Sequence, residues 1–375
     1  MIRRRRVALG TIAGLALIAG AVLGAGGGDG GGAGEPPAAA DAPACPQELA
    51  ESPRRLAGAM LVVRMEDEAT PELLAAAREG EIGGLIVFPV AVDDAAELEP
   101  EIERLQRAAR RGGNLPLLVM IDQEGGGASR FPLQPPQRSP FQLADFGTAR
   151  DSRLEGQATG NFLRRVGIGI DLAPVLDVPE SESSAMALRA FGDTPQRVAR
   201  LGVAFAEGLA DERTVAVPKH FPGLGRTDVS TDAAPVTIDA SRRQLRGDLV
   251  PFREAIARGA EMIMVGLAAY PAFGSERPAS FAPEIVDGLL RGELGFDGVV
   301  ITDDVEAPAI SAAGTGEGRA AVAAATAGVD LVLLALGGGG DALPALARAI
   351  RRERVDPGSV AETCARLVEL RSARG

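Results

Sequence analysis

The residues with the most distinctive chemistry lie in Val217–Pro235, which reads VPKHFPGLGRTDVSTDAAP. This stretch contains the only histidine, His220, and the only lysine, Lys219, among 39 lysine and arginine residues. The lysine ammonium group is a compact point charge, whereas the arginine guanidinium group is wide and planar. The single lysine therefore indicates a position where arginine could not replace it. The pair follows the short apolar run Thr214–Val217, which predicts that both side chains lie at the C-terminal end of a β-strand.

Two other apolar runs end in acids. Leu117–Ile121 is followed by an Asp-Gln-Glu-Gly-Gly-Gly stretch that begins at Asp122, and Gly298–Thr302 is followed by Asp303 and Asp304. One acid after a strand often caps the next helix, but three polar strand ends at one edge would form a pocket of mixed charge. Such a pocket suits a neutral, hydroxyl-rich ligand. Its expected members are Asp122, Lys219, His220 and Asp303.

Apolar runs alternate with helical patterns through the rest of the chain. Continuous apolar strands between helices predict a parallel sheet that is covered on both faces. About eight such units fit a closed (β/α)₈ TIM-type barrel, in which the C-terminal strand ends line the active site. The expected strands are Met60–Met65, Gly84–Phe88, Leu117–Ile121, Gly167–Leu172, Thr214–Val217, Met262–Leu267, Gly298–Thr302 and Leu331–Leu336. The expected helices include Pro71–Arg78, Glu97–Arg110, Thr194–Ala210, Pro251–Arg258 and Glu317–Ala327.

Composition limits the function further. The chain has 375 residues, a net charge of −12 and a pI of about 4.9. An acidic chain whose body has no basic run argues against a nucleic-acid partner. Aromatic residues make up only 3%, so stacking surfaces for bases or sugars must be few.

The N-terminus predicts export. Arg3–Arg6 precede the uncharged run Val7–Ala25, so residues 1–25 are expected to be a signal peptide or an anchor in the cytoplasmic membrane. Residues 26–44, rich in glycine, alanine and proline, are expected to be a flexible linker. The single folded domain is then 45–375. Its two cysteines, Cys45 and Cys364, are predicted to form a disulfide outside the cytoplasm, although two free thiols are an alternative.

Three motifs resemble those of glycoside hydrolase family 3, in particular its single-domain bacterial β-N-acetylhexosaminidases. They read IDQEGGGASRF, KHFPGLG and GFDGVVITDDVEAPAI, in that order along the chain. The resemblance implies a barrel that removes terminal β-linked N-acetylglucosamine with retention, often from cell-wall fragments. It also implies no metal or organic cofactor, and we expect a monomer with a carbohydrate substrate.

The resemblance assigns roles to individual residues. Asp303 matches the nucleophile, which forms a glycosyl-enzyme intermediate. Asp122 matches the acid that binds the sugar hydroxyls. The expected sugar-binding cations and donors are Arg130, Arg189, Lys219 and His220. We interpret Asp304 as a residue that orients Asp303 or caps the next helix.

This chain departs from the family where the proton is transferred. The family loop reads KHFPGHG and then Asp-Ser-His, whose last residue is the usual general acid/base. Here Leu224 replaces the first histidine, Ser230 replaces the aspartate and Asp232 replaces the acid/base histidine. Leu267 replaces a further family histidine. Asp232 is therefore the predicted substitute acid/base.

Three hypotheses remain from the sequence. The chain is an exported glycosidase that uses Asp232, or its rival Asp228, as the acid/base. It is a non-catalytic carbohydrate-binding protein of the cell envelope on the same barrel. Or it is a different barrel enzyme. Turnover of an N-acetylglucosaminide, measured together with binding, separates the first two.

Overall fold

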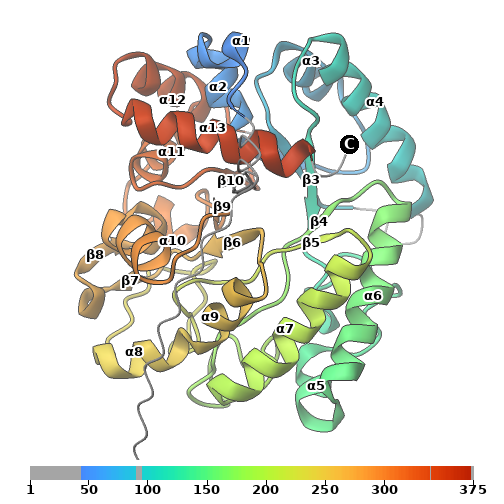
Figure 1. Ribbon diagram of the computed structural model, residues 1–375, viewed down its shortest axis with the longest axis vertical. Coiled ribbons are helices and arrows are strands. Elements are labelled where there is room, and N and C mark those ends of the chain that lie inside the picture. Colours follow the sequence, from blue (N-terminus) through green and yellow to red (C-terminus); the bar gives the residue numbers. More distant parts are fainter. Residues whose placement is uncertain (1–43, 90–94, 338, 373–375) are drawn as a thin grey trace, which may run out of the picture. The chain divides into compact units, whose positions relative to one another are not determined.

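The computed structural model describes residues 44–89, 95–337 and 339–372, which all belong to the unit Ala42–Gly375 (Figure 1). The expected signal or anchor segment 1–25 and residues 26–43 of the expected linker lie outside the described residues. Within the described part of the chain, no helix is long and apolar enough to cross a membrane.

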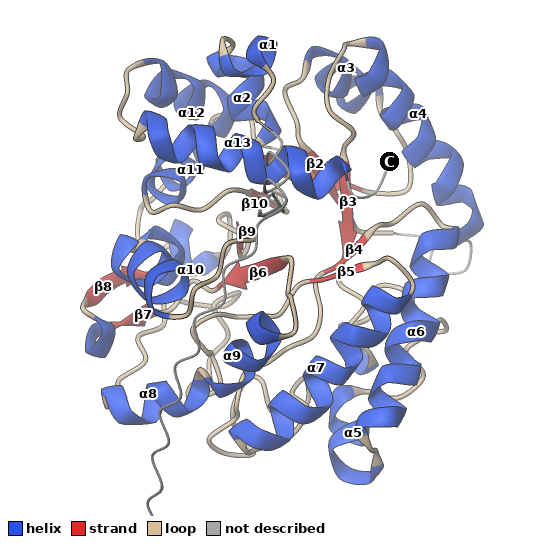
Figure 2. Ribbon diagram, in the orientation of Figure 1, coloured by secondary structure: helices blue, strands red, loops and turns tan. Residues whose placement is uncertain are grey.

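Parallel strands close into the barrel that the apolar runs predicted (Figures 1 and 2). Six strands pair in the order β10-β1-β2-β3-β4-β5, and β6 pairs with β9. Parallel bridges between Phe221 and Val265 and between Ile301 and Leu331 join the two sheets, so the ring is complete. The barrel strands are β1 (Leu61–Met65), β2 (Gly84–Val87), β3 (Leu118–Ile121), β4 (Ile170–Asp171), β5 (Val215–Ala216), β6 (Met262–Val265), β9 (Val299–Thr302) and β10 (Val332–Leu334).

Helices surround the strands (Figure 2). Several begin at a serine or threonine that accepts a backbone N–H of the first turn and is followed by proline, as at Ser52, Thr70 and Ser139. Both features favour a helix start. The α-helices are α1 (Gln47–Ala50), α2 (Pro53–Ala59), α3 (Pro71–Glu79), α4 (Leu98–Arg111), α5 (Pro140–Phe146), α6 (Ala149–Arg165), α7 (Pro195–Asp211), α8 (Arg242–Asp248), α9 (Val250–Ala257), α10 (Pro308–Ser311), α11 (Glu317–Thr326), α12 (Ala342–Arg351) and α13 (Pro357–Ser372). Shorter or tighter turns are η1 (Ala95–Glu97), η2 (Gly126–Ala128), η3 (Pro271–Phe273) and η4 (Ala279–Phe281), and η5 (Glu284–Glu293) is a π-helix.

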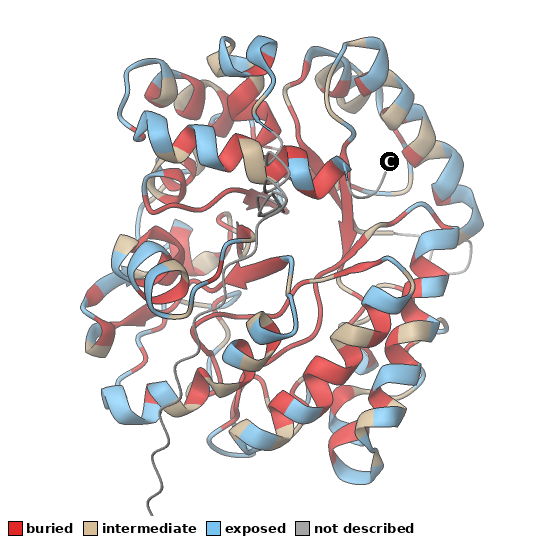
Figure 3. Cartoon of the chain, in the orientation of Figure 1, coloured by how far each residue is buried: buried red, intermediate tan, exposed pale blue. Residues whose placement is uncertain are grey.

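The core lies inside the barrel and between the barrel and its helices. Strands β2, β3, β6 and β9 are buried at every position. Figure 3 shows the strands as buried and the outer helix faces as exposed. Strands that are buried on both faces need apolar side chains throughout, which explains the continuous apolar runs of the sequence.

A small antiparallel hairpin, β7 (Ala269–Tyr270) and β8 (Ser275–Pro278), follows β6 and was not predicted. Its strands are too short and too rich in proline to show a period of two. The hairpin supports the loop after β5, because the buried Tyr270 hydroxyl donates to the carbonyl of Gly223 at 2.9 Å.

A disulfide joins Cys45, ahead of α1, to Cys364 in α13, with the two Cα atoms 5.3 Å apart. Helix α13 is also held by Arg371, which is buried and donates to the carbonyls of Ala59, Gly83 and Pro116. Burial lowers the pKa of Arg371 to about 10. These contacts attach the last helix to the N-terminal ends of β1, β2 and β3.

Candidate active site

The carboxyl ends of the strands surround a cavity of about 460 Å³. Its wall contains the predicted nucleophile, the predicted acid/base Asp232 and the predicted sugar-binding residues, but not the rival acid Asp228. These residues are Asp122, Arg130, Arg189, Lys219, His220, Asp232 and Asp303. They lie after four strands, β3, β4, β5 and β9, so the barrel brings together groups that are far apart in the sequence.

One side of the cavity is a buried network of ion pairs centred on Lys219. Its Nζ lies 2.7 Å from Asp122 Oδ1 and 2.6 Å from Glu124 Oε1. Arg189 binds Glu124 through two contacts, of 2.8 Å from Nε and 2.6 Å from Nη2. The Lys219 side chain is only 2% exposed, which leaves little room for the broader guanidinium group of arginine.

Charge pairing controls the protonation of this network. Burial alone would raise the pKa of Asp122 and Glu124, but the positive charge of Lys219, with Arg130 or Arg189, outweighs it and lowers both values. Burial alone would lower the pKa of Lys219, but the negative charges of Asp122 and Glu124 outweigh burial and raise it. The network therefore stays ionised at neutral pH and offers fixed donors and acceptors for sugar hydroxyls.

Arg130 lies at the edge of this network. Its Nη2 donates to Asp122 Oδ2 at 3.1 Å, and its guanidinium covers one face of Phe88, 4.0 Å from the ring centre. Arg64 lies over the same ring at 4.4 Å. Cation–π contact of this kind stabilises a guanidinium group in a fixed orientation.

His220 is held by Asp177, which the sequence analysis did not select. Nδ1 of His220 is 2.7 Å from Asp177 Oδ2, and both side chains are buried. Asp177 Oδ1 also accepts the backbone N–H groups of His220, at 3.2 Å, and Leu224, at 2.7 Å. This carboxylate fixes the ring and its loop together, and leaves Nε2 as the nitrogen available to the cavity.

Asp303 follows β9 on the other side of the cavity. Its Oδ1 accepts the backbone N–H of Asp304 at 2.8 Å, and no cation lies within ion-pair distance of it among the described residues. Burial raises the pKa of Asp303 and the negative charge of Asp232 raises it further, whereas His220 lowers it.

Asp304 supports its neighbour and faces the backbone of the adjacent strand. Its Oδ1 accepts the backbone N–H groups of Glu306 and Ala335, each at 3.1 Å. Burial raises the pKa of Asp304 to about 6. These contacts agree with a structural interpretation of Asp304.

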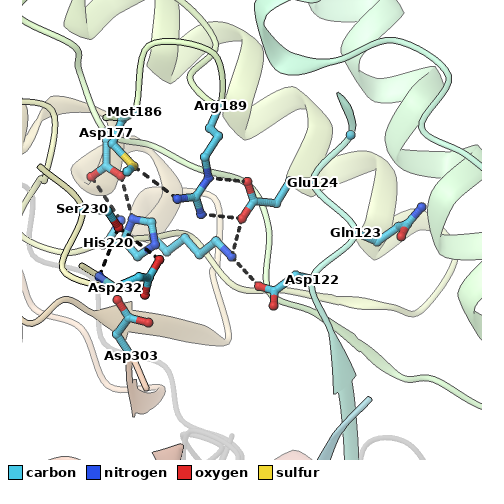
Figure 4. Close-up of polar contacts among 12 residues, drawn as sticks. Asp122, Gln123, Glu124, Asp177, Met186, Arg189, His220, Ser230, Asp232 and Asp303 are labelled. Carbon is cyan, nitrogen blue, oxygen red and sulfur yellow. Dashed lines mark hydrogen bonds and ion pairs between the residues drawn. The ribbon is translucent and has the colours of Figure 1, made fainter. Parts of the chain in front are cut away.

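Asp232 lies on a loop that is folded against α10. The carbonyl of Thr231, a buried residue, accepts the backbone N–H of Ala309 at 3.1 Å. Asp232 itself is exposed, and its Oδ2 accepts the Ser230 hydroxyl at 3.0 Å. Figure 4 shows Asp232 and Asp303 beside each other near His220. The rival acid Asp228 instead accepts the Ser183 hydroxyl at 2.8 Å and does not line the cavity.

Glu124 and Asp177 are the site residues that sequence reasoning missed. Glu124 was visible as the second acid of the motif that begins at Asp122, but its pairing with Lys219 and Arg189 depends on other strands. Asp177 lies five positions beyond the expected end of its strand at Leu172, so it was not recognised as a strand-end residue. In the described part of the chain, no group of three or more His, Cys, Asp or Glu side chains could hold a metal ion.

A closed barrel that places a strand-end carboxylate in one cavity with a network suited to hydroxyl groups is the arrangement that a barrel glycosidase requires. Residues 55–370 match the Glycosyl hydrolase family 3 N terminal domain. The chain therefore belongs to glycosyl hydrolase family 3.

Comparison with individual proteins agrees with this family. The chain is 33% identical, over 68% of its length and 74% of the relative's, to an uncharacterized secreted glycosyl hydrolase from Arthroderma benhamiae. It is 35% identical to a beta-hexosaminidase from Stenotrophomonas maltophilia, over 57% of this chain and 66% of that protein.

Solved structures give the same result. A family 3 beta-N-acetylglucosaminidase from Paenibacillus sp. str. FPU-7 superposes with a TM-score of 0.81 and 33% identity, over 86% of this chain and 62% of that one. LpqI from M tuberculosis superposes with a TM-score of 0.77 and 28% identity, over 88% and 98% of the two chains. This chain thus spans less than two thirds of the Paenibacillus and Stenotrophomonas proteins.

Proposed function

We propose that the protein is an exported β-N-acetylhexosaminidase that hydrolyses terminal β-linked N-acetylglucosamine, or a related sugar, with retention of configuration. The observation that carries the proposal is the position of Asp303, a carboxylate that lines the cavity outside the network of Asp122, Glu124, Lys219 and Arg189 and has no ion-pair partner among the described residues. A pyranose ring held by that network presents its anomeric carbon toward the carboxylate.

In this mechanism Asp303 attacks the anomeric carbon and forms a covalent glycosyl-enzyme intermediate, which water then hydrolyses. The nucleophile must be ionised. Burial and the negative charge of Asp232 raise the pKa of Asp303, and His220, the backbone N–H of Asp304 and Lys219 oppose that rise. Lys219, Arg189, Arg130 and His220 bind hydroxyl groups and fix the ring.

Asp232 is the proposed acid/base. It lines the cavity next to Asp303, and its loop is held against α10 by the contact between Thr231 and Ala309. It would protonate the leaving oxygen and then activate water. General acid–base catalysis contributes about 10²–10⁴ in rate, so turnover of substrates with poor leaving groups depends on this residue.

A second candidate function is carbohydrate binding without hydrolysis. The observation that favours it is the loss of the family's Asp-Ser-His sequence, since the side-chain partner of Asp232 among the described residues is the Ser230 hydroxyl. The deciding experiment incubates the protein with a chromogenic β-N-acetylglucosaminide and measures sugar binding by calorimetry in the same preparation. Binding without release of the chromophore would support the second function and contradict the first.

The proposed setting is the cell envelope, with cell-wall turnover as one role. A positively charged start before an apolar run supports export, as does the similarity to a secreted glycosyl hydrolase. Residues 7–25 would either be cleaved or attach the protein to the cytoplasmic membrane. We also propose a monomer. Fractionation of cells, with the mass of the mature chain, tests cleavage and attachment together.

A further inference from the structure

We propose that the leaving-group side of the cavity selects an uncharged apolar aglycone, an alkyl or aryl group, in preference to a second sugar. This inference rests on the proposed hydrolase function, because that function identifies the sides of the cavity that hold the sugar and the leaving group.

A general acid must reach the leaving oxygen directly or through one water molecule, so the aglycone must pass beside Asp232. The loop of Asp232 lies against the start of α10 through the contact between Thr231 and Ala309. Ala307 and Pro308, at that end of α10, line the cavity. Beyond the Ser230 hydroxyl that contacts Asp232, Ala307 and Pro308 therefore give this part of the wall an apolar surface, and the ionic network of Lys219 lies elsewhere in the cavity.

Leu336, two residues after the end of β10, adds to this apolar surface. Its side chain lines the cavity and is 63% exposed, among the most exposed large apolar side chains of the described residues. Its backbone is fixed, because Glu306 Oε2 accepts the N–H groups of Leu336, at 2.6 Å, and Gly337, at 2.9 Å. Fixed apolar surface that faces water at the mouth of a binding cavity gains free energy when an apolar ligand covers it.

The cavity offers little aromatic surface to a second pyranose. Phe88 is the aromatic residue among the described residues that line the cavity, and the guanidinium groups of Arg64 and Arg130 lie over its ring at 4.4 Å and 4.0 Å. A sugar that stacked on Phe88 would have to compete with these two groups. The groups that bind hydroxyls, Lys219 and its partners, are already assigned to the first sugar.

The test uses the full chain with methyl and octyl β-N-acetylglucosaminides and with N,N′-diacetylchitobiose. Methyl and octyl compounds both release simple primary alcohols, so the ratio of their kcat/KM values reports contact with the aglycone. We expect the octyl compound to exceed the methyl compound by about tenfold or more, which is the gain for roughly two methylene groups leaving water. It should also exceed the disaccharide.

Matched variants identify the surface. Leu336→Ser should bring the octyl-to-methyl ratio close to one. Leu154→Ser makes the same change at a leucine of α6 that is 49% exposed and does not line the cavity, and should keep the wild-type ratio. An octyl-to-methyl ratio near one in the wild type, or a ratio unchanged by Leu336→Ser, would overturn the proposal.

Calorimetry with methyl and octyl thioglycosides, which resist hydrolysis, gives the same comparison without turnover. Suppose that the protein hydrolyses none of these substrates but binds the octyl thioglycoside more tightly than the methyl one, and that Leu336→Ser removes this preference. That result would refute the hydrolase function and support the apolar subsite. Equal affinities for the two thioglycosides would refute the subsite whether or not the protein is active.

Discussion

Replacing Lys219 with methionine tests whether the ion-pair network holds the barrel mouth together. Lys219 is buried and joins Asp122 to Glu124, while Arg130 and Arg189 each hold one of these acids from the outside. Methionine fills a similar volume without charge. The variant therefore removes the central cation and leaves each acid with one arginine.

The magnitude follows from this arrangement. Removing one partner of a buried ion pair costs about 3–5 kcal/mol, because a charge is left buried without its counter-ion. Each acid keeps an arginine here, so we expect a value near the lower end, about 3 kcal/mol. That is a large fraction of the 5–15 kcal/mol that typically separates folded from unfolded domains.

Urea unfolding at neutral pH, followed by circular dichroism, measures the change. Arg107→Met is the matched control: Arg107 pairs with Glu103 at 3.4 Å on the surface, where ion pairs contribute little. Its midpoint should stay close to that of the wild type. A Lys219→Met variant as stable as the control would refute the reasoning.

The pH dependence gives a second check on the same variant. The folded protein lowers the pKa of Asp122 and Glu124, so both stabilise the fold above their ordinary pKa near 4 and lose that contribution as pH falls through the lowered values. The gap between wild type and Lys219→Met should therefore be largest at neutral pH and shrink below about pH 4. A gap that is constant down to acidic pH contradicts the assignment.

Four other predictions concern the site and the fold. Asp303→Ala should abolish hydrolysis while the circular dichroism spectrum is kept, and a near-wild-type rate would exclude Asp303 as the nucleophile. Asp232→Ala should slow substrates with poor leaving groups most, and azide should restore turnover as a glycosyl azide of retained configuration; an unchanged dependence on the leaving group would exclude Asp232. Asp177→Asn should weaken sugar binding about ten- to a hundredfold in calorimetry, the equivalent of about 1.5–3 kcal/mol for a lost charged hydrogen bond, and unchanged affinity would show that the carboxylate does not position the ring. Cys45→Ser should lower stability by on the order of 5 kcal/mol, the chain-entropy value for so long a loop, and an unchanged melting temperature would contradict that account.

The barrel could be predicted from the sequence because its strands are buried on both faces and read as continuous apolar runs. Boundaries were less accurate: Gly167–Leu172 was expected where β4 covers only Ile170–Asp171. Beyond the ends of β4 and β5, the two segments that follow these strands pair once more, through a single parallel bridge between Val175 and Lys219. Pairing at such a point depends on the curvature of the closed sheet, which local composition does not reveal.

The site was predicted through residue types at strand ends, and its partners were not. Lys219 and Asp122 are 97 positions apart, and His220 and Asp177 are 43 apart. The spacing of these residues along the sequence does not indicate which acidic side chain pairs with which cationic or imidazole side chain. The roles of Glu124 and Asp177 became visible only when the barrel placed neighbouring strands in contact.

The disulfide between Cys45 and Cys364 makes the barrel a covalent ring. The two cysteines are 319 positions apart and enclose every barrel strand, and a ring that is cut once remains one molecule. A protease that cleaves the long connection between β4 and α7, or that between β5 and α8, would leave two new ends tied together by sulfur as well as by packing. For a protein that works outside the cell, as proposed here, the bridge thus gives tolerance to a single nick in the very loops that carry the site.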